Sequence, residues 1–199
     1  MKHIKKTIGL TGPTGAGKST AARFFKDKGA FIIDCDVLAR EIVMPGKKAL
    51  KEIVEYFGAE ILMQDGTLDR KKLGSVVFSD HQKRLILNQI THKYITEELI
   101  KQLKTAEGIA MIDAPLLFEA GLEALCDAVV VVTAKEEIRQ SRIVQRDQMS
   151  QEEAYNRISA QKPNRDYEEK ADFLLENNAD EQSFMINCER IWRLICEEE

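Results

Sequence analysis

The chain has 199 residues, of which 44% are hydrophobic and 31% charged, and its formal net charge is −4 at pH 7. These values are typical of a globular protein and predict a single domain over residues 1–199. The acidic balance argues against a general attraction to nucleic acid, and no apolar run approaches the roughly 20 residues of a membrane span. We therefore expect neither nucleic acid nor a membrane among its partners.

The cysteines carry no pattern of a metal site or a redox pair. Cys35, Cys126, Cys188 and Cys196 include no C-x-x-C pair and no companion histidine at zinc spacing. Free thiols in a reducing compartment are the simplest interpretation. The apolar run near the amino terminus is too short for a signal peptide, so we expect a cytoplasmic protein.

Short apolar segments alternate with longer amphipathic segments along the chain. Runs of this kind are typical of parallel strands that are buried on both faces. The expected strands are residues 7–11, 30–34, 109–113, 128–133 and 172–177. Their alternation with helical patterns predicts an α/β fold with a doubly wound parallel sheet, although the order of the strands stays open.

The first expected strand is followed by the stretch GPTGAGKST, and an amphipathic segment over 18–29 comes next. This matches G-x-x-x-x-G-K-[ST] in the strand-loop-helix context that a phosphate-binding loop requires. Small residues let backbone N–H groups converge on phosphate oxygens, while Lys18 reaches the β- and γ-phosphates and Ser19 ligates Mg²⁺. The predicted nucleotide-binding residues are Gly12, Pro13, Thr14, Gly15, Ala16, Gly17, Lys18, Ser19 and Thr20.

Three aspartates stand at the ends of expected strands. Asp34 and Asp36 follow the second strand and Asp113 ends the third, at the edge where an open α/β sheet binds its ligands. We expect Asp34 or Asp36 to face the transferred phosphate and Asp113 to contact Mg²⁺ through water. The alternative is that Asp36 caps the following helix and pairs with Arg40 four residues on.

Two regions do not fit a simple alternation of strands and helices. Residues 36–104 have a mostly helical pattern, longer than one crossover needs, and predict an inserted helical lobe. Its clearest helix covers 80–104, where Ile86, Ile90, Ile95 and Leu99 form an apolar stripe. The second region, about 135–165, is rich in charge.

Arg139, Arg142 and Arg146 lie three and four residues apart, and therefore on one face of a helix. A solvated helix face is one explanation. The phosphate loop favours the other, because phosphoryl transfer needs cations near the equatorial oxygens. Further cations in the same region are Arg157, Lys162 and Arg165.

Several segments together resemble the dephospho-coenzyme A kinase family over nearly the whole chain. IIDCDVLAREIV is similar to the family's D-x-D-x-x-A-R segment, APLLFEAG at 114–121 to its P-L-L-F-E signature, and RIVQRD at 142–147 to its lid arginine segment. The stretches LDRKKLGSVVF, RISAQ and ADFLLENN also fit. The phosphate loop alone is generic, whereas the aspartate segment and the P-L-L-F-E signature in this order are specific.

The resemblance implies a P-loop kinase-like fold, in which residues 36–104 form the acceptor lobe and about 135–165 the lid. It implies ATP-dependent phosphorylation of the 3′-hydroxyl of dephospho-coenzyme A to coenzyme A, the last step of coenzyme A biosynthesis, by a monomer or small homo-oligomer. Asp36, Lys18 and Arg146 then take catalytic positions, with Asn177 at the nucleotide. The residues implied on the acceptor side are Asp34, Arg40, His92, Leu117, Phe118 and Glu119.

The chain departs from the family pattern at three positions. Pro13 and Asn178 stand where glycine is usual, and Lys93 stands where proline is usual. Two other functions are compatible with the loop: a kinase of the same fold for a nucleoside, nucleotide or sugar acid, and a nucleotide-driven switch. The absence of an N-K-x-D motif and the arginine-rich region argue against the switch.

Overall fold

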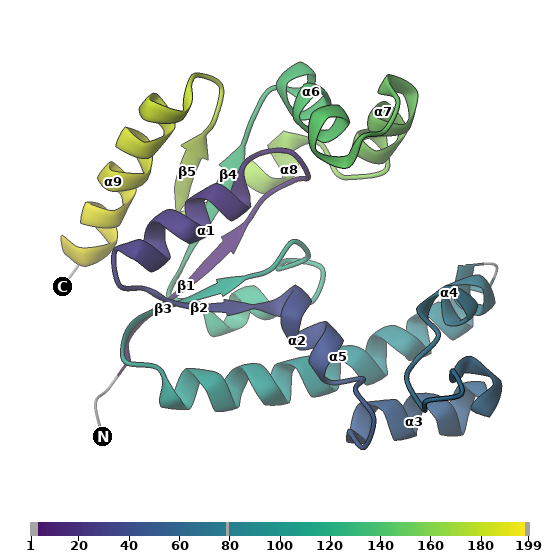
Figure 1. The fold of residues 1–199 in the computed structure, drawn as a ribbon. Coiled ribbons are helices and arrows are strands. Elements are labelled where there is room, and N and C mark those ends of the chain that lie inside the picture. The colour runs from purple at the N-terminus through teal and green to yellow at the C-terminus, as the bar shows by residue number, and fades with distance from the viewer. Residues whose placement is uncertain (1–3, 79, 198–199) are drawn as a thin grey trace. The chain divides into compact units, whose positions relative to one another are not determined.

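The computed structural model describes residues 4–78 and 80–197 (Figure 1). It divides into two compact units. The sheet unit consists of the described residues up to Ile33 and those from Ala106 onward, and the helical unit of Asp34–Thr105. The helical unit thus lies at nearly the residues predicted as the insertion.

The sheet has the order β2-β3-β1-β4-β5. Its strands are β1 Ile4–Thr11, β2 Phe31–Asp34, β3 Gly108–Asp113, β4 Ala128–Thr133 and β5 Phe173–Glu176. β1 pairs in parallel with β3 and β4, and β4 with β5. The predicted parallel α/β sheet is confirmed, and its order places β1 in the centre, so the loop after β1 opens at the middle of the ligand-binding edge.

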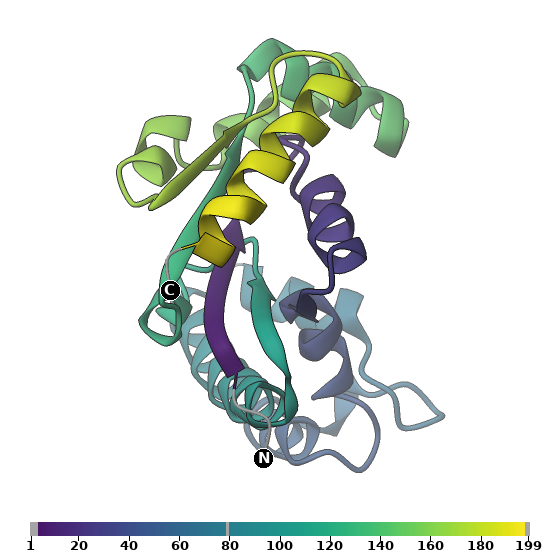
Figure 2. The same cartoon turned by 90° about the vertical axis from the view of Figure 1, so that its left-hand side faces the viewer.

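The helices of the sheet unit are α1 Lys18–Asp27, α6 Glu136–Asp147, α7 Gln151–Ser159, α8 Asn164–Glu168 and α9 Glu181–Glu197, with the short 3₁₀ helix η2 Leu122–Leu125. Figures 1 and 2 show α1 and α9 side by side against the sheet. Phe25 of α1 and Ile191 of α9 are buried there against Ile8 and Val130 of the strands. All of β4 is buried, as expected for a parallel strand that has a neighbour on each side.

The helical unit contains α2 Cys35–Glu41, α3 Lys48–Phe57, α4 Arg70–Phe78 and α5 His81–Thr105, with the 3₁₀ helix η1 Ala59–Ile61. The predicted helical pattern is confirmed, and α5 begins and ends one residue later than its predicted range. In the predicted stripe Ile90 and Leu99 are buried, whereas Ile86 and Ile95 are partly buried. No helix within the described residues is long and apolar enough to cross a membrane.

Candidate active site

The phosphate loop connects the end of β1 at Thr11 to the start of α1 at Lys18. Gly17 is the N-cap of α1 with φ 108°, and an added Cβ would overlap Nδ2 of Asn177. Both the backbone angle and the space therefore require glycine. Gly17 has no side chain with which to cap α1, and the N–H groups at the start of such a helix form an anion-binding site.

Lys18 forms an ion pair with Asp113, the last residue of β3. The exposed fractions of the two side chains are 16% and 8%, so the pair is largely screened from water. Ser19 follows in α1 and is exposed. The structure thus brings together the predicted phosphate-binding lysine and a carboxylate predicted to contact the metal.

Asn177 lies directly after β5 and supports the phosphate loop. Its backbone N–H donates to the Thr133 carbonyl at 2.8 Å, and its Nδ2 donates to the Ala16 carbonyl at 2.8 Å. Its Oδ1 accepts from Arg142 Nη2 at 3.1 Å. Asn177 was predicted at the nucleotide site; its side chain is buried, and both atoms of its amide group are hydrogen-bonded within the protein.

Arg139 and Arg142 also bond to the loop backbone. Arg139 Nε donates to the Thr14 carbonyl at 2.9 Å, and Arg142 Nη1 lies 3.4 Å from the Gly15 carbonyl and 3.3 Å from that of Ala16. Burial lowers the pKa of both guanidinium groups. Neither role was predicted, because the charge pattern of α6 does not distinguish a side chain that faces inward from one that faces a ligand.

Arg146, at the end of the same helix, has different partners. Its Nε and Nη2 donate to the Asp147 carboxylate at 2.7 and 2.8 Å, and Arg157 donates to the same carboxylate at 2.6 Å. The hydrogen bonds from Arg146 are the main cause that lowers the pKa of Asp147 to about 2. The three arginines predicted to act together therefore separate into two that hold the loop and one, 58% exposed, that pairs with Asp147.

The P-L-L-F-E segment follows β3. Leu117 is fully buried, and its Cδ2 would crowd a Cβ added to Gly9 of β1. Leu116 is 58% exposed. In this structure Leu117 is a core residue, and the leucine before it is the one that presents apolar surface.

Phe118 and Glu119 contact the segment between α7 and β5. Glu119 pairs with Lys162 at 3.0 Å. The Phe118 ring lies 6.4 Å from that of Tyr167 between centroids, and Lys170 Nζ lies 4.9 Å from the Phe118 centroid. These interactions link the loop after β3 to the end of the charged region.

In the helical unit, the N-cap of α2 is Asp34 and not Asp36. Asp34 Oδ1 accepts from the N–H groups of Asp36 and Val37 at 2.8 and 3.1 Å. Because α2 begins at Cys35, Asp36 is already inside the first turn. The ion pair between Asp36 and Arg40, which belongs to the alternative interpretation of Asp36, is not formed in the described residues. Both side chains are exposed, and His92 is half-buried on α5, which packs against α2.

Lys93, where the family usually has proline, belongs to the uninterrupted helix α5. Lys93 Nζ and the Tyr94 hydroxyl donate to Oε2 of Glu52 on α3, at 3.1 and 2.6 Å. The hydrogen bond from Tyr94, followed by that from Lys93, lowers the pKa of Glu52. Beside this cluster lies a cavity of about 450 Å³ whose lining includes Tyr56 and Ile90.

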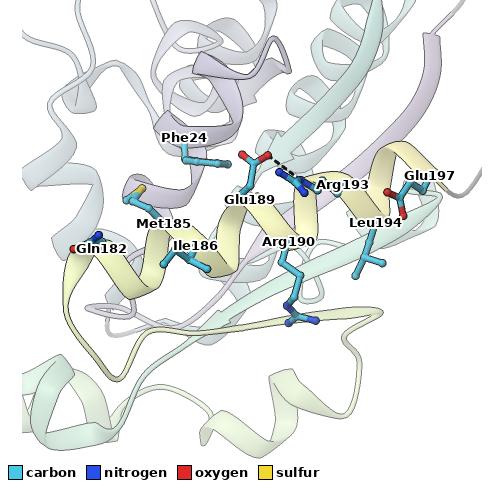
Figure 3. A pocket seen from close by; sticks show the side chains of 9 residues that line it. All are labelled: Phe24, Gln182, Met185, Ile186, Glu189, Arg190, Arg193, Leu194 and Glu197. Atoms are coloured by element: carbon cyan, nitrogen blue, oxygen red, sulfur yellow. Dashed lines mark hydrogen bonds and ion pairs between the residues drawn. The ribbon is translucent and has the colours of Figure 1, made fainter.

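A further groove of about 610 Å³ runs along α9 (Figure 3). It is lined by Phe24, Gln182, Met185, Ile186, Glu189, Arg190, Arg193, Leu194 and Glu197. Its charged groups are partly paired, since Glu189 accepts from Arg193 at 3.1 Å and pairs with Lys28 at 2.5 Å. None of the predicted site residues lines this groove.

Comparison with known proteins identifies the family of the chain. A family profile described as dephospho-CoA kinase matches residues 6–183. A dephospho-CoA kinase from Listeria monocytogenes serovar 1/2a is 43% identical over 177 residues, which cover 87% of this chain and 88% of that protein. The crystal structure of TT1252 from Thermus thermophilus gives a TM-score of 0.83 at 30% identity over 100% of both chains. A dephospho-CoA kinase from Campylobacter jejuni gives 0.70 at 29% identity over 95% of this chain and 96% of that one. The chain therefore belongs to the dephospho-CoA kinase family.

Proposed function

We propose that this kinase transfers the γ-phosphoryl group of ATP to the 3′-hydroxyl of dephospho-coenzyme A, which gives coenzyme A and ADP. The observation that carries the proposal is a helix start with glycine at its N-cap beside the Lys18–Asp113 pair, in a chain of this family. A phosphate loop alone fits many reactions, and the family match selects the acceptor.

In this proposal the ATP phosphates bind the N–H groups at the start of α1 and the Lys18 ammonium. Lys18 already lies against Asp113, so the ammonium is held at the loop before the phosphates arrive. Fixed donors that meet the charge developing on the transferred group lower the barrier without reorganisation. Asn177 contributes by holding the Ala16 carbonyl.

Mg²⁺ would be held by the hydroxyl of Ser19 and, through water, by Asp113. Mg²⁺ in kinase sites typically takes one or two protein oxygens together with phosphate oxygens and waters. A hydroxyl in the first turn of α1 and a carboxylate paired with the adjacent lysine fit that requirement. The ion would neutralise part of the phosphate charge.

Asp36 is proposed to orient the 3′-hydroxyl and accept its proton. Support comes from the cap of α2: Asp34 already performs that structural role, and the Asp36 carboxylate is exposed. A carboxylate within hydrogen-bond reach can align a hydroxyl and take the proton as the new bond forms. We further propose Asp34, Arg40, His92, Phe118 and Glu119 on the acceptor side, and Arg146 in a lid over about 135–165.

An ADP-release assay with a panel of acceptors tests the proposed reaction. ADP should form rapidly with dephospho-coenzyme A and slowly with nucleosides, nucleotides or sugar acids. Equal ATP consumption without any acceptor would contradict a kinase function and support a nucleotide-driven switch. Rapid turnover of a different acceptor would contradict the proposed substrate.

The base assignment is tested by Asp36→Asn, which preserves size and removes charge. The expected result is a fall in kcat of about a hundredfold or more, with ATP affinity near that of the wild type. The matched control is Asp65→Asn, at an exposed turn of the same unit, where asparagine can still accept from Thr67. Near-normal kcat in Asp36→Asn would refute the assignment.

A further inference from the structure

Gln161 and Arg139 hold the backbone of Thr14 from both sides. Gln161 Oε1 accepts from the Thr14 N–H at 2.9 Å and from Arg139 Nη2 at 3.1 Å. Arg139 Nε donates to the Thr14 carbonyl at 2.9 Å. The two side chains and one loop residue thus form a closed set of hydrogen bonds, and the proposed reaction assigns no role to either side chain.

Arg139 is a buried cation that bonds to neutral oxygens. It is 3% exposed, and its remaining hydrogen bond goes from Nη1 to Oδ1 of Asn164 at 2.9 Å. Asn164 is fixed in turn by its bond to the Ala134 carbonyl at 2.9 Å. Within the described part of the chain, no carboxylate lies within ion-pair distance of Arg139. Its charge is therefore uncompensated by contact, and a buried charge acts over a longer range than an exposed one.

The contacts on the carbonyl side also orient the N–H groups of the loop. In a trans peptide the C=O and the following N–H point in opposite directions. Arg139 holds the Thr14 carbonyl, and Asn177 Nδ2 holds that of Ala16. The N–H groups of Gly15 and Gly17 are therefore directed away from these side chains.

We infer that Arg139 and Gln161 are positioning residues for the triphosphate of the nucleotide. They fix the phosphate loop through Thr14, and the neutral amide of Gln161 leaves the charge of Arg139 available to attract the phosphates. This inference rests on the proposed function, because it takes ATP as the ligand of the loop. A carboxylate at position 161 would satisfy the same hydrogen bonds but cancel that charge.

Gln161→Glu is the variant that separates hydrogen bonding from charge. Glutamate retains an oxygen acceptor for Thr14 and Arg139, and Gln161 is only half-buried, so the fold should be retained. We expect ATP affinity to fall about tenfold, because the new charge repels the phosphates. The KM for dephospho-coenzyme A should stay unchanged. Gln161→Ala, which removes the acceptor without adding charge, should lose less ATP affinity.

The matched control is Gln145→Glu, which adds the same charge at an exposed position of α6. Its ATP affinity should be that of the wild type. Binding is measured by equilibrium titration of ATP, together with KM for both substrates and a thermal melt of each variant. Wild-type ATP affinity in Gln161→Glu would overturn the inference, because the added charge would then have no effect on the phosphates. Wild-type ATP affinity in Gln161→Ala would overturn it too, because the loop would then not depend on the hydrogen bonds of Gln161. If the wild type itself fails to phosphorylate dephospho-coenzyme A, the proposed function fails instead.

Discussion

Replacing Gly17 with alanine should destabilise the sheet unit, because two separate penalties meet at this residue. A left-handed conformation costs a residue with a Cβ about 1–2 kcal/mol, and Gly17 has φ 108°. The new Cβ would also overlap Nδ2 of Asn177 and displace its hydrogen bond to the Ala16 carbonyl. Disrupting a buried hydrogen bond adds about 1–3 kcal/mol.

The two penalties together amount to about 2–5 kcal/mol. For a chain of this size, that corresponds to a fall in Tm of roughly 5–15 °C. ATP affinity should fall with it, because the N–H groups at the start of α1 move when Asn177 is displaced. Circular dichroism melts and an ATP titration measure the two effects.

Gly29→Ala is the matched control. Gly29 has φ +100° and follows the other end of α1, but a Cβ there would meet nothing within 4 Å. This variant should show the backbone penalty alone, a few degrees in Tm. In Gly17→Ala combined with Asn177→Ala, the losses should be less than additive, because the overlap is relieved. Equal Tm losses for the two glycine variants, or strict additivity in the double variant, would refute the contact with Asn177.

Three further predictions concern charge and motion. Lys18→Ala should retain the fold and lower kcat at least a hundredfold through the lost contact with phosphate; a wild-type rate would exclude this loop as the ATP site. Hydrogen bonds from Arg146 lower the pKa of Asp147 from its ordinary 3.8 to about 2, so their stabilisation is present above about pH 4 and lost as pH falls toward 2. Asp147→Asn should therefore lose less stability than the wild type over that window, and superimposable acid-unfolding curves would contradict it. Hydrogen exchange over 135–165 should slow when ATP and dephospho-coenzyme A are both bound, whereas unchanged exchange would argue against a lid.

The strands could be predicted from the sequence because buried parallel strands read as continuous apolar runs. The predicted limits of all five lie within three residues of those observed. Strand order could not be predicted, since it depends on contacts between distant residues. Gly9 of β1 pairs with Ile112 of β3, for example, and no local pattern encodes that pairing.

The phosphate loop could be predicted because its chemistry requires a contiguous motif. The residues that support the loop could not be predicted, because Arg139 and Gln161 contact it from distant segments of the chain. Gln161 is also uncharged, so it is not part of the charge pattern visible in the sequence. The cap of α2 shows a different limit: a shift of the helix start by two residues decides whether Asp34 or Asp36 is the cap. Local patterns place such features only to within a residue or two.

The hydrogen bonds that hold the phosphate loop determine when, during synthesis of the chain, the loop can reach its final conformation. Thr14 and Ala16 leave the ribosome well before their partners Arg139 and Asn177, which are 125 and 161 residues further along. During synthesis the loop therefore emerges long before the groups that fix it. A nascent chain should acquire affinity for ATP only after residue 177 has been translated and β5 has joined the sheet, which makes nucleotide capture a late event in the biogenesis of this enzyme.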